Sequence, residues 1–246
     1  MFCMHIYPLH LNWFAHMKTL ERNKLSPDIG SPSLDPGAML SSIWNHHESA
    51  NGESMKVTER TTIRIHPERA VPEEAVEILS AGMIAHVGFV EDGQPLVIPL
   101  SYHYDPSNPS LLYLHGGVKS RAMDHLANGA PICVTVTLLD GLVYSRKAMN
   151  HSMNYRSVVL LGKARAITSA QEKFDLFDQM VKRYFTDRTL ETDYNPPPAA
   201  DLGATSLVEV TIEEWNAKAR RGSPTGPDDD SDDATGSAGV IELREL

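Results

Sequence analysis

The chain has 246 residues, of which 41% are hydrophobic and 22% charged, and its formal net charge is −10. This length and composition suit one domain of moderate size with extensions. Half of the net charge comes from the five aspartates of segment 222–239, which contains no Lys or Arg. We expect no nucleic-acid partner, because that would need a basic face. We also expect no membrane partner, because no apolar run approaches the roughly 18 residues that a spanning helix requires.

The ends of the chain differ in composition from its middle. Residues 1–55 join an apolar start that lacks a basic leader region to a Ser- and Pro-rich stretch, so we expect a poorly ordered extension. The domain should cover residues 56–222, followed by an acidic flexible linker at 223–239 and a short strand or tail at 240–246. The two cysteines, Cys3 and Cys133, are too few for a disulfide framework and indicate a reducing, cytoplasmic setting.

The first element predicted in chain order is a short helix over residues 72–82. Pro72 suits the first helical position, two glutamates follow it, and Gly82 suits the end. Two β-rich runs come next, at 83–90 and 95–104, and Asp92-Gly93 between them is typical of a tight hairpin turn. Two antiparallel strands are therefore expected here.

Further strand-like runs follow the first hairpin. They lie at 111–115, 131–139, 142–146 and 155–168. Asp140-Gly141 separates two of these runs and predicts a second hairpin. Gly162 lies inside the longest run, where we expect a bulge or a close approach of another backbone.

A second helix is predicted over residues 169–185, because Ser169 and Glu172 form a capping box and apolar side chains recur at spacings of three and four. We interpret that stripe as core packing rather than as a cofactor-binding motif. Its members are Phe174, Phe177, Val181 and Tyr184. The run at 206–222 then alternates between apolar and polar side chains, as in a strand with one buried face.

The order of these elements indicates the fold class. Hairpins dominate and helices are few, which favours a mainly β protein over a doubly wound α/β fold. We predict a six-stranded antiparallel β-barrel with peripheral helices.

The stretch YLHGGVKSRAMDHL, residues 113–126, offers features suited to an anion. Two glycines permit close backbone approach, Lys119 supplies a point charge, Ser120 a hydroxyl donor, and Arg121 a planar fork for two oxygens. They stand directly before a helical pattern, whose first N–H groups also favour phosphate. A solvated helix start with two surface cations would explain the spacing equally well. No glycine motif of a dinucleotide fold or a P-loop is present.

From about residue 57 to 222 the chain resembles the flavin-nucleotide-binding, pyridoxamine 5′-phosphate oxidase-like split-barrel family, and within it the nitroimidazole-reductase-like branch. The resemblance rests on HVGFVEDGQPLVIPLSYHY, LYLHGGVKSRAMDHLANGAPICVTVTLLDGLV, HSMNYRSVVLLGKARAI and AKARRGSP, in that order. It implies a six-stranded FMN-binding split barrel that forms a homodimer, with FMN in a groove between the subunits. The anion at residues 113–126 would then be the FMN phosphate.

The same resemblance implies a set of cofactor-binding residues. They are Ile98, Pro99, Leu100 and Ser101 along the isoalloxazine ring, His115, Gly116, Lys119, Ser120 and Arg121 near the ribityl phosphate, and Tyr155, Arg156 and Ser157 on the facing strand. From the residues alone, 98–101 could equally be core. An arginine inside a β run favours an acidic or phosphate partner for Arg156. His115 and Tyr155 are the candidate proton donors.

The implied activity is an FMN-dependent oxidoreductase acting on a small molecule, in which the cofactor carries the redox chemistry. True pyridoxamine phosphate oxidase activity is not expected, because the C-terminal VIELREL lacks the basic strand of those enzymes. A non-catalytic flavin-binding or haem-binding split-barrel protein is the alternative. Haem would need a histidine, and the candidates are His86, His103, His115, His125 and His151. None has a recognisable metal-binding spacing, so no metal site is predicted.

Overall fold

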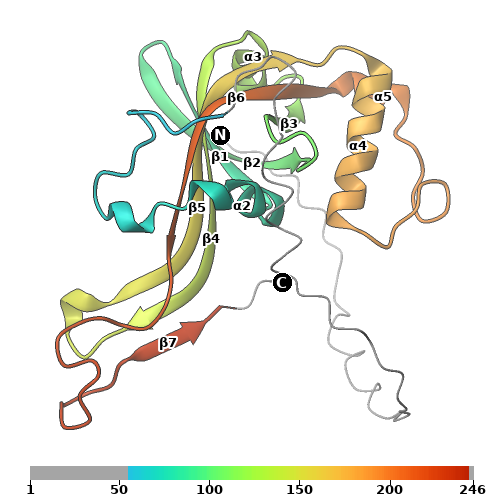
Figure 1. The fold of residues 1–246 in the computed structure, drawn as a ribbon. Helices are drawn as coiled ribbons and strands as arrows, with labels where there is room; N and C mark the ends of the chain where they lie inside the picture. The colour runs from blue at the N-terminus through green and yellow to red at the C-terminus, as the bar shows by residue number, and fades with distance from the viewer. Residues whose placement is uncertain (1–54, 244–246) are drawn as a thin grey trace, which may run out of the picture. The chain divides into compact units, whose positions relative to one another are not determined.

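The structure is a computed structural model, which describes residues 55–243. Its strands form one antiparallel sheet in the order β1-β2-β3-β6-β5-β4-β7, and β1 also pairs with β4, which closes six of them into a barrel (Figure 1). The strands are β1 Ile84–Glu91, β2 Gln94–Tyr104, β3 Leu111–Gly117, β4 Pro131–Tyr144, β5 Ser152–Ala166, β6 Thr205–Arg220 and β7 Gly239–Glu242. The predicted mainly β split-barrel fold is confirmed.

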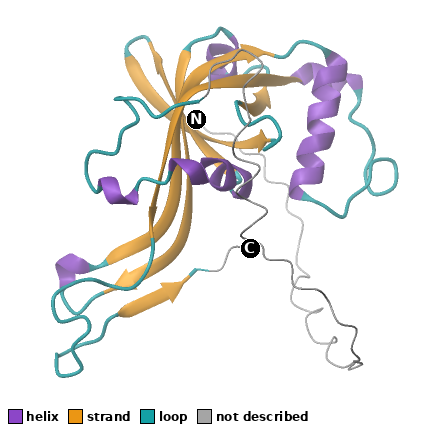
Figure 2. Cartoon of the chain, viewed as in Figure 1, coloured by secondary structure: helices purple, strands orange, loops and turns teal. Residues whose placement is uncertain are grey.

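The helices lie around this barrel (Figure 2). They are η1 Pro67–Arg69, η2 Pro72–Glu74, α2 Ala75–Ala81, α3 Arg121–Ala127, η3 Ala148–Asn150, α4 Ala170–Tyr184 and α5 Ala199–Ala204. Buried residues of α2 and α3 join the main core inside the barrel. α4 instead covers part of the outer side of the sheet, where Leu176 and Met180 pack against Ile167 and Leu207 as a second, smaller core.

The first hairpin is confirmed at the predicted dipeptide. Asp92 and Gly93 join β1 to β2 with φ angles of 49° and 80°. Both angles are positive, which is the requirement of the turn whose twist matches two antiparallel strands. The helix before β1 also ends at Gly82 as predicted.

The second predicted hairpin, at Asp140-Gly141, is wrong. β4 continues through this dipeptide to Tyr144, with a register shift between Leu139 and Gly141, and the chain turns back only at residues 145–151. A long-range contact explains the difference, because the Asp140 carboxylate is bound by Arg156 of the neighbouring strand β5. On its other side Gly141 pairs with β7. The dipeptide therefore makes a bulge in a paired strand.

Gly162 lies at the predicted irregularity. The register of β5 on β6 shifts between Leu161 and Gly162, and a Cβ at this glycine would lie 2.1 Å from the carbonyl oxygen of Thr211. The backbones of β5 and β6 therefore approach more closely here than any side chain would allow.

The helix at 170–184 begins as predicted, because the amide of Glu172 donates to the hydroxyl of Ser169 at 3.3 Å. The stripe at Phe174, Phe177, Val181 and Tyr184 is only half-buried, however, whereas Leu176 and Met180 are buried. Because α4 covers the outer side of β6, both faces of that strand are buried at Leu207 and Val208. The prediction of a single buried face is wrong for this part of β6.

The C-terminal part of the described chain folds back onto the barrel strands. β7 pairs with residues 141–144 of β4, at the end where β4 and β5 run beyond the barrel (Figure 1). Before it, Asp229 accepts hydrogen bonds from the Ser145 hydroxyl and the amides of Arg146 and Gly226. The segment expected as a linker is thus tied to the β4–β5 connection. The expected extension at 1–55 lies outside the described residues except for Met55.

Candidate flavin-binding site

The predicted ring-binding segment lies on β2, which alternates between the two faces of the sheet. Pro99 and Ser101 face outward, whereas Ile98 and Leu100 are half-buried and pack against the main core. The structure therefore divides the predicted set. The side chains of Pro99 and Ser101 can contact a ligand on the outer face. Ile98 and Leu100 pack against the core on the inner side of the same strand.

His115 on β3 lies beside this segment. The pairing of β2 with β3 ends at Tyr102 and Leu114, and Ser101 and His115 are the next residues beyond that pair. The His115 ring meets Phe177 of α4 edge-on, with centroids 5.5 Å apart, and its buried Nδ1 has no hydrogen-bond partner. Burial lowers the pKa of His115, so the imidazole is neutral at neutral pH.

The turn after β3 brings together the predicted phosphate-binding residues. Its backbone is fixed by hydrogen bonds from the amide of Ser120 to the Gly117 carbonyl at 2.8 Å and from the amide of Val118 to the Ala204 carbonyl at 3.0 Å. A Cβ at Gly116 would lie 2.8 Å from the Met123 side chain, so glycine is needed where α3 crosses the strand.

The side chains of this turn differ in how far they are already engaged. Lys119 is exposed and makes no ion pair with any residue from 55 to 243, and the hydroxyl of Ser120 does not cap α3. The guanidinium of Arg121 pairs with Glu91 of β1 at 3.1 Å while its side chain remains 73% exposed. Lys119 and Ser120 are thus the groups most available to a phosphate.

The third predicted group does not lie with the other two. Because alternate residues of a strand face opposite sides, Tyr155 and Ser157 lie on the outer side of β5 and Arg156 on the other. There Arg156 binds both oxygens of Asp140 at 2.8–3.2 Å and approaches Glu77 of α2 at 3.8 Å. Of the two predicted kinds of partner, the structure shows the acidic one.

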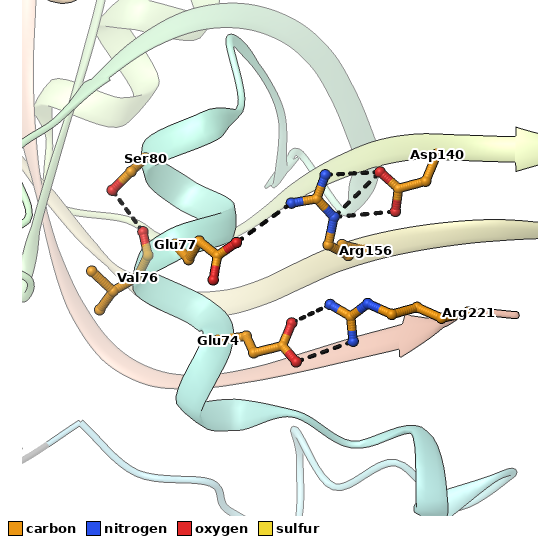
Figure 3. A network of polar contacts seen from close by, with 7 residues as sticks. All are labelled: Glu74, Val76, Glu77, Ser80, Asp140, Arg156 and Arg221. Carbon is orange, nitrogen blue, oxygen red and sulfur yellow. Dashed lines mark hydrogen bonds and ion pairs between the residues drawn. The ribbon is translucent and has the colours of Figure 1, made fainter. Parts of the chain in front are cut away.

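This Arg156 contact belongs to a network that fastens α2 to the strands. Beside it, Arg221 makes a two-pronged ion pair with Glu74 (Figure 3). Strands β1 and β4 lie between residues 155–157 on β5 and Ser101 on β2. The distance around the barrel from β2 to β5 is therefore about 14 Å, at roughly 4.8 Å per strand. One subunit thus does not place residues 155–157 and Ser101 at the same end of a ligand.

Sequence reasoning missed Arg183, which fixes the end of β2 beside the candidate site. Its guanidinium donates to the carbonyls of Tyr102, Gly82, Leu79 and Ser80 at 2.6–3.1 Å and stacks 4.6 Å from the centre of the Tyr102 ring. These bonds join α4, the end of α2 and β2. In the sequence, Arg183 looks like any cation in the last turn of a helix, so no local signal could reveal it.

The candidate haem-binding histidines differ in how far they are buried. His103 is 5% exposed beneath α4, and neither ring nitrogen has a hydrogen bond in the described structure. Burial, followed by the charge of Arg183, lowers the pKa of His103, while Gln179 and Asp105 act in the opposite direction. His125 stacks on Phe89 inside the fold. On the outer face of the barrel strands, His86 is exposed and His115 is half-buried, and His151 is exposed in the connection between β4 and β5.

Within residues 55–243, no group of three or more His, Cys, Asp or Glu side chains could hold a metal ion. Within the same residues, no helix is long and apolar enough to cross a membrane.

Comparisons with known proteins identify relatives of this chain. The profile of the family described as pyridoxamine 5′-phosphate oxidase matches residues 72–219. The flavocytochrome Anf3 from Azotobacter vinelandii is 31% identical with a TM-score of 0.68, over 78% of this chain and 88% of that one. The FAD and heme binding protein from Mycobacterium smegmatis is 30% identical with a TM-score of 0.63, over 71% of this chain and 84% of that one. A search of curated proteins gave no match.

Proposed function

Because this chain belongs to the pyridoxamine 5′-phosphate oxidase-like family, we propose that it is a flavin-binding protein that acts as an oxidoreductase on a small molecule. Membership rests on the match over residues 72–219 and on the two solved relatives. A bound flavin would supply hydride or electron transfer, and the protein would bind it, orient it and exclude water.

The observation that carries this proposal is the arrangement of adjacent strands β2 and β3. Ser101 and His115 lie just beyond the Tyr102–Leu114 pair, where the pairing of β2 with β3 ends, and the turn that follows β3 presents Lys119 and Ser120. The ammonium of Lys119 and the hydroxyl of Ser120 suit the phosphate of a riboflavin phosphate, and the partly apolar strand face beside them suits its ring. Neutral His115 can donate one hydrogen bond to the ligand, and no other described side chain is needed for the redox step.

Riboflavin 5′-phosphate is common to FMN and FAD, and the site is assigned to that shared part. The single phosphate turn and the missing dinucleotide glycine motif support FMN, which we retain as the expected cofactor. The relative from Mycobacterium smegmatis, which is named as binding FAD, supports the longer nucleotide. Mass analysis of the flavin released from purified protein distinguishes them: FMN is expected, FAD would overturn that choice alone, and no flavin after reconstitution would overturn the site.

The proposed working unit is a homodimer with the flavin between subunits. Apolar side chains on the outer face support it, since Val97 is 67%, Ile84 48% and Val159 38% exposed in the single chain. A second subunit would cover these residues and could bring its own Tyr155 and Ser157 to the ligand. Light scattering after size exclusion should show twice 27.2 kDa. A monomer that retains one flavin per chain would refute the intersubunit site.

Haem is a second candidate ligand, supported by the names of both solved relatives. A haem iron needs a neutral imidazole with a free nitrogen that the macrocycle can reach. Exposed His86 on β1 fits this requirement. His115 is neutral and faces outward, but it would fit only through Nε2, because its Nδ1, which has no hydrogen-bond partner among the described residues, is buried. His103 does not fit, because α4 covers it. A Soret band that is lost in His115→Ala or His86→Ala would establish this ligand, and no Soret band after haem addition would exclude it.

A further inference from the structure

An open pocket of about 310 Å³ lies between α4, α5 and the loop that connects them. Phe174, Phe177 and Val181 of α4 form one wall, and Leu190 of the loop lies opposite. These α4 residues belong to the stripe that the sequence pattern assigned to the core, and their partial burial leaves this hollow. Its volume falls at the lower end of the range of small-molecule sites, about 300–1,000 Å³.

The pocket is built by specific polar contacts. The carboxylate of Asp178 accepts a hydrogen bond from the Tyr194 hydroxyl at 2.6 Å and pairs with Lys182 at 2.6 Å. These two contacts, that of Lys182 first, lower the pKa of Asp178, so it stays charged and holds the loop against α4. At the rim, the carboxylate of Asp201 is exposed and makes no hydrogen bond or ion pair with any residue the structure describes.

The pocket adjoins the turn assigned to the flavin phosphate. Phe177, which lines it, makes the edge-on contact with His115. Thr205, at its floor, pairs with Gly117 of β3, two residues before Lys119. A molecule in this pocket would therefore be separated from the proposed flavin site by a single layer of side chains.

We propose that this pocket binds a planar aromatic molecule that is neutral or positively charged. Its aromatic and aliphatic walls suit a flat apolar ligand, and aromatic faces also attract cations. Its lining includes Asp178 and Asp201 but no Lys or Arg, so an anion would lose its hydration without gaining a partner. The nearby ammonium of Lys173 is directed to the carbonyls of Leu202 and Thr205.

The proposal stands on the pocket's own residues, and it would survive the failure of the flavin assignment. If the flavin is bound as proposed, the occupant lies beside it, which makes this pocket the candidate substrate site of the proposed oxidoreductase.

A matched pair of probes tests the ligand class on the full-length protein. N-phenyl-1-naphthylamine is neutral, and 1-anilinonaphthalene-8-sulfonate carries the same rings with a negative charge. Equilibrium dialysis followed by chromatographic quantification avoids optical interference from flavin. We expect saturable binding of one neutral probe per chain, and binding of the sulfonate weaker by about tenfold or more. No saturable binding of the neutral probe, or equal affinity for both probes, would overturn the proposal.

Two variants locate the binding. Val181→Trp fills the pocket and should weaken binding of the neutral probe by about tenfold or more, while Gln171→Trp adds the same ring at an exposed position of α4 and should leave it unchanged. Equal binding by Val181→Trp and wild type would show that the probe lies elsewhere and would overturn the proposal. The flavin content of each variant is measured separately, so a failure of the flavin assignment is seen independently of probe binding.

Discussion

Replacing Gly162 by alanine should be the most damaging single-methyl change in the barrel. The added Cβ would lie 2.1 Å from the carbonyl oxygen of Thr211 and 3.1 Å from its carbonyl carbon. Both are backbone atoms, so no side chain can rotate away. Thr211 is also paired on both sides, with Leu111 of β3 and Lys163 of β5, which prevents β6 from retreating alone.

The magnitude follows from the kind of contact that would be broken. Overpacking costs about 1–3 kcal/mol and occasionally more, and the rigid backbone contact here puts Gly162→Ala at about 3 kcal/mol. At roughly 2–4 °C per kcal/mol for a chain of this size, the melting temperature of Gly162→Ala should fall by roughly 6–12 °C. Thermal unfolding followed by far-ultraviolet circular dichroism measures this.

Gly203→Ala is the matched control. No atom lies within 4 Å of a Cβ at Gly203, which is in the short helix α5, so the change should be neutral or stabilising by up to about 1 kcal/mol. If Gly162→Ala melts within about 2 °C of wild type, the close approach of β5 and β6 does not constrain this position, and the reasoning is refuted.

Four further substitutions test the site and its surroundings. Lys119→Ala should weaken flavin binding by roughly tenfold to a hundredfold, or about 1.5–3 kcal/mol, and Arg121→Ala should weaken it less, because Arg121 is already paired with Glu91. Fluorescence titration of the apoprotein measures both affinities, and a Lys119→Ala variant that binds flavin as tightly as wild type would contradict this. Burial lowers the pKa of His103, so the stability contributed by its neutral ring is complete above about pH 6.5 and is lost on acidification. His103→Leu should therefore lose less stability than wild type toward about pH 5. Urea unfolding of both proteins measures this, and the same pH dependence in the variant as in wild type would contradict it. Asp229→Ala removes both carboxylate oxygens, which together accept hydrogen bonds from three donors, so limited proteolysis should cut residues 223–238 faster. An unchanged rate would show that this carboxylate does not hold the segment.

The parts of the fold that could be predicted from the sequence depend on short-range chemistry. Asp92-Gly93 makes its turn because both residues adopt positive φ, a property of the dipeptide itself. Asp140-Gly141 carries the same local signal, but β5 on one side and β7 on the other hold it in an extended strand. Pairing with distant strands overrides local propensity, and the dipeptide contains no information about those strands.

The candidate site shows the same division. The turn proposed to bind phosphate is continuous in sequence, so its glycine, lysine and serine could be proposed from their spacing alone, and their role stays a prediction. The orientation of Arg156 could not, because its partners are Asp140 on the next strand and Glu77 on a helix far back in the chain. Nor could the pocket between α4, α5 and their connecting loop be predicted, since half-buried Phe177 and buried Leu176 look alike in a helical pattern.

The measurement that tests the central claim most directly is the identity of the cofactor in purified protein. The visible spectrum, followed by mass analysis of the released ligand, should show oxidised flavin at about one per chain, with FMN as the species. Loss of that flavin in Lys119→Ala, with the fold intact by circular dichroism, would place it at the turn after β3. Protein that binds neither FMN nor FAD after reconstitution would contradict the account.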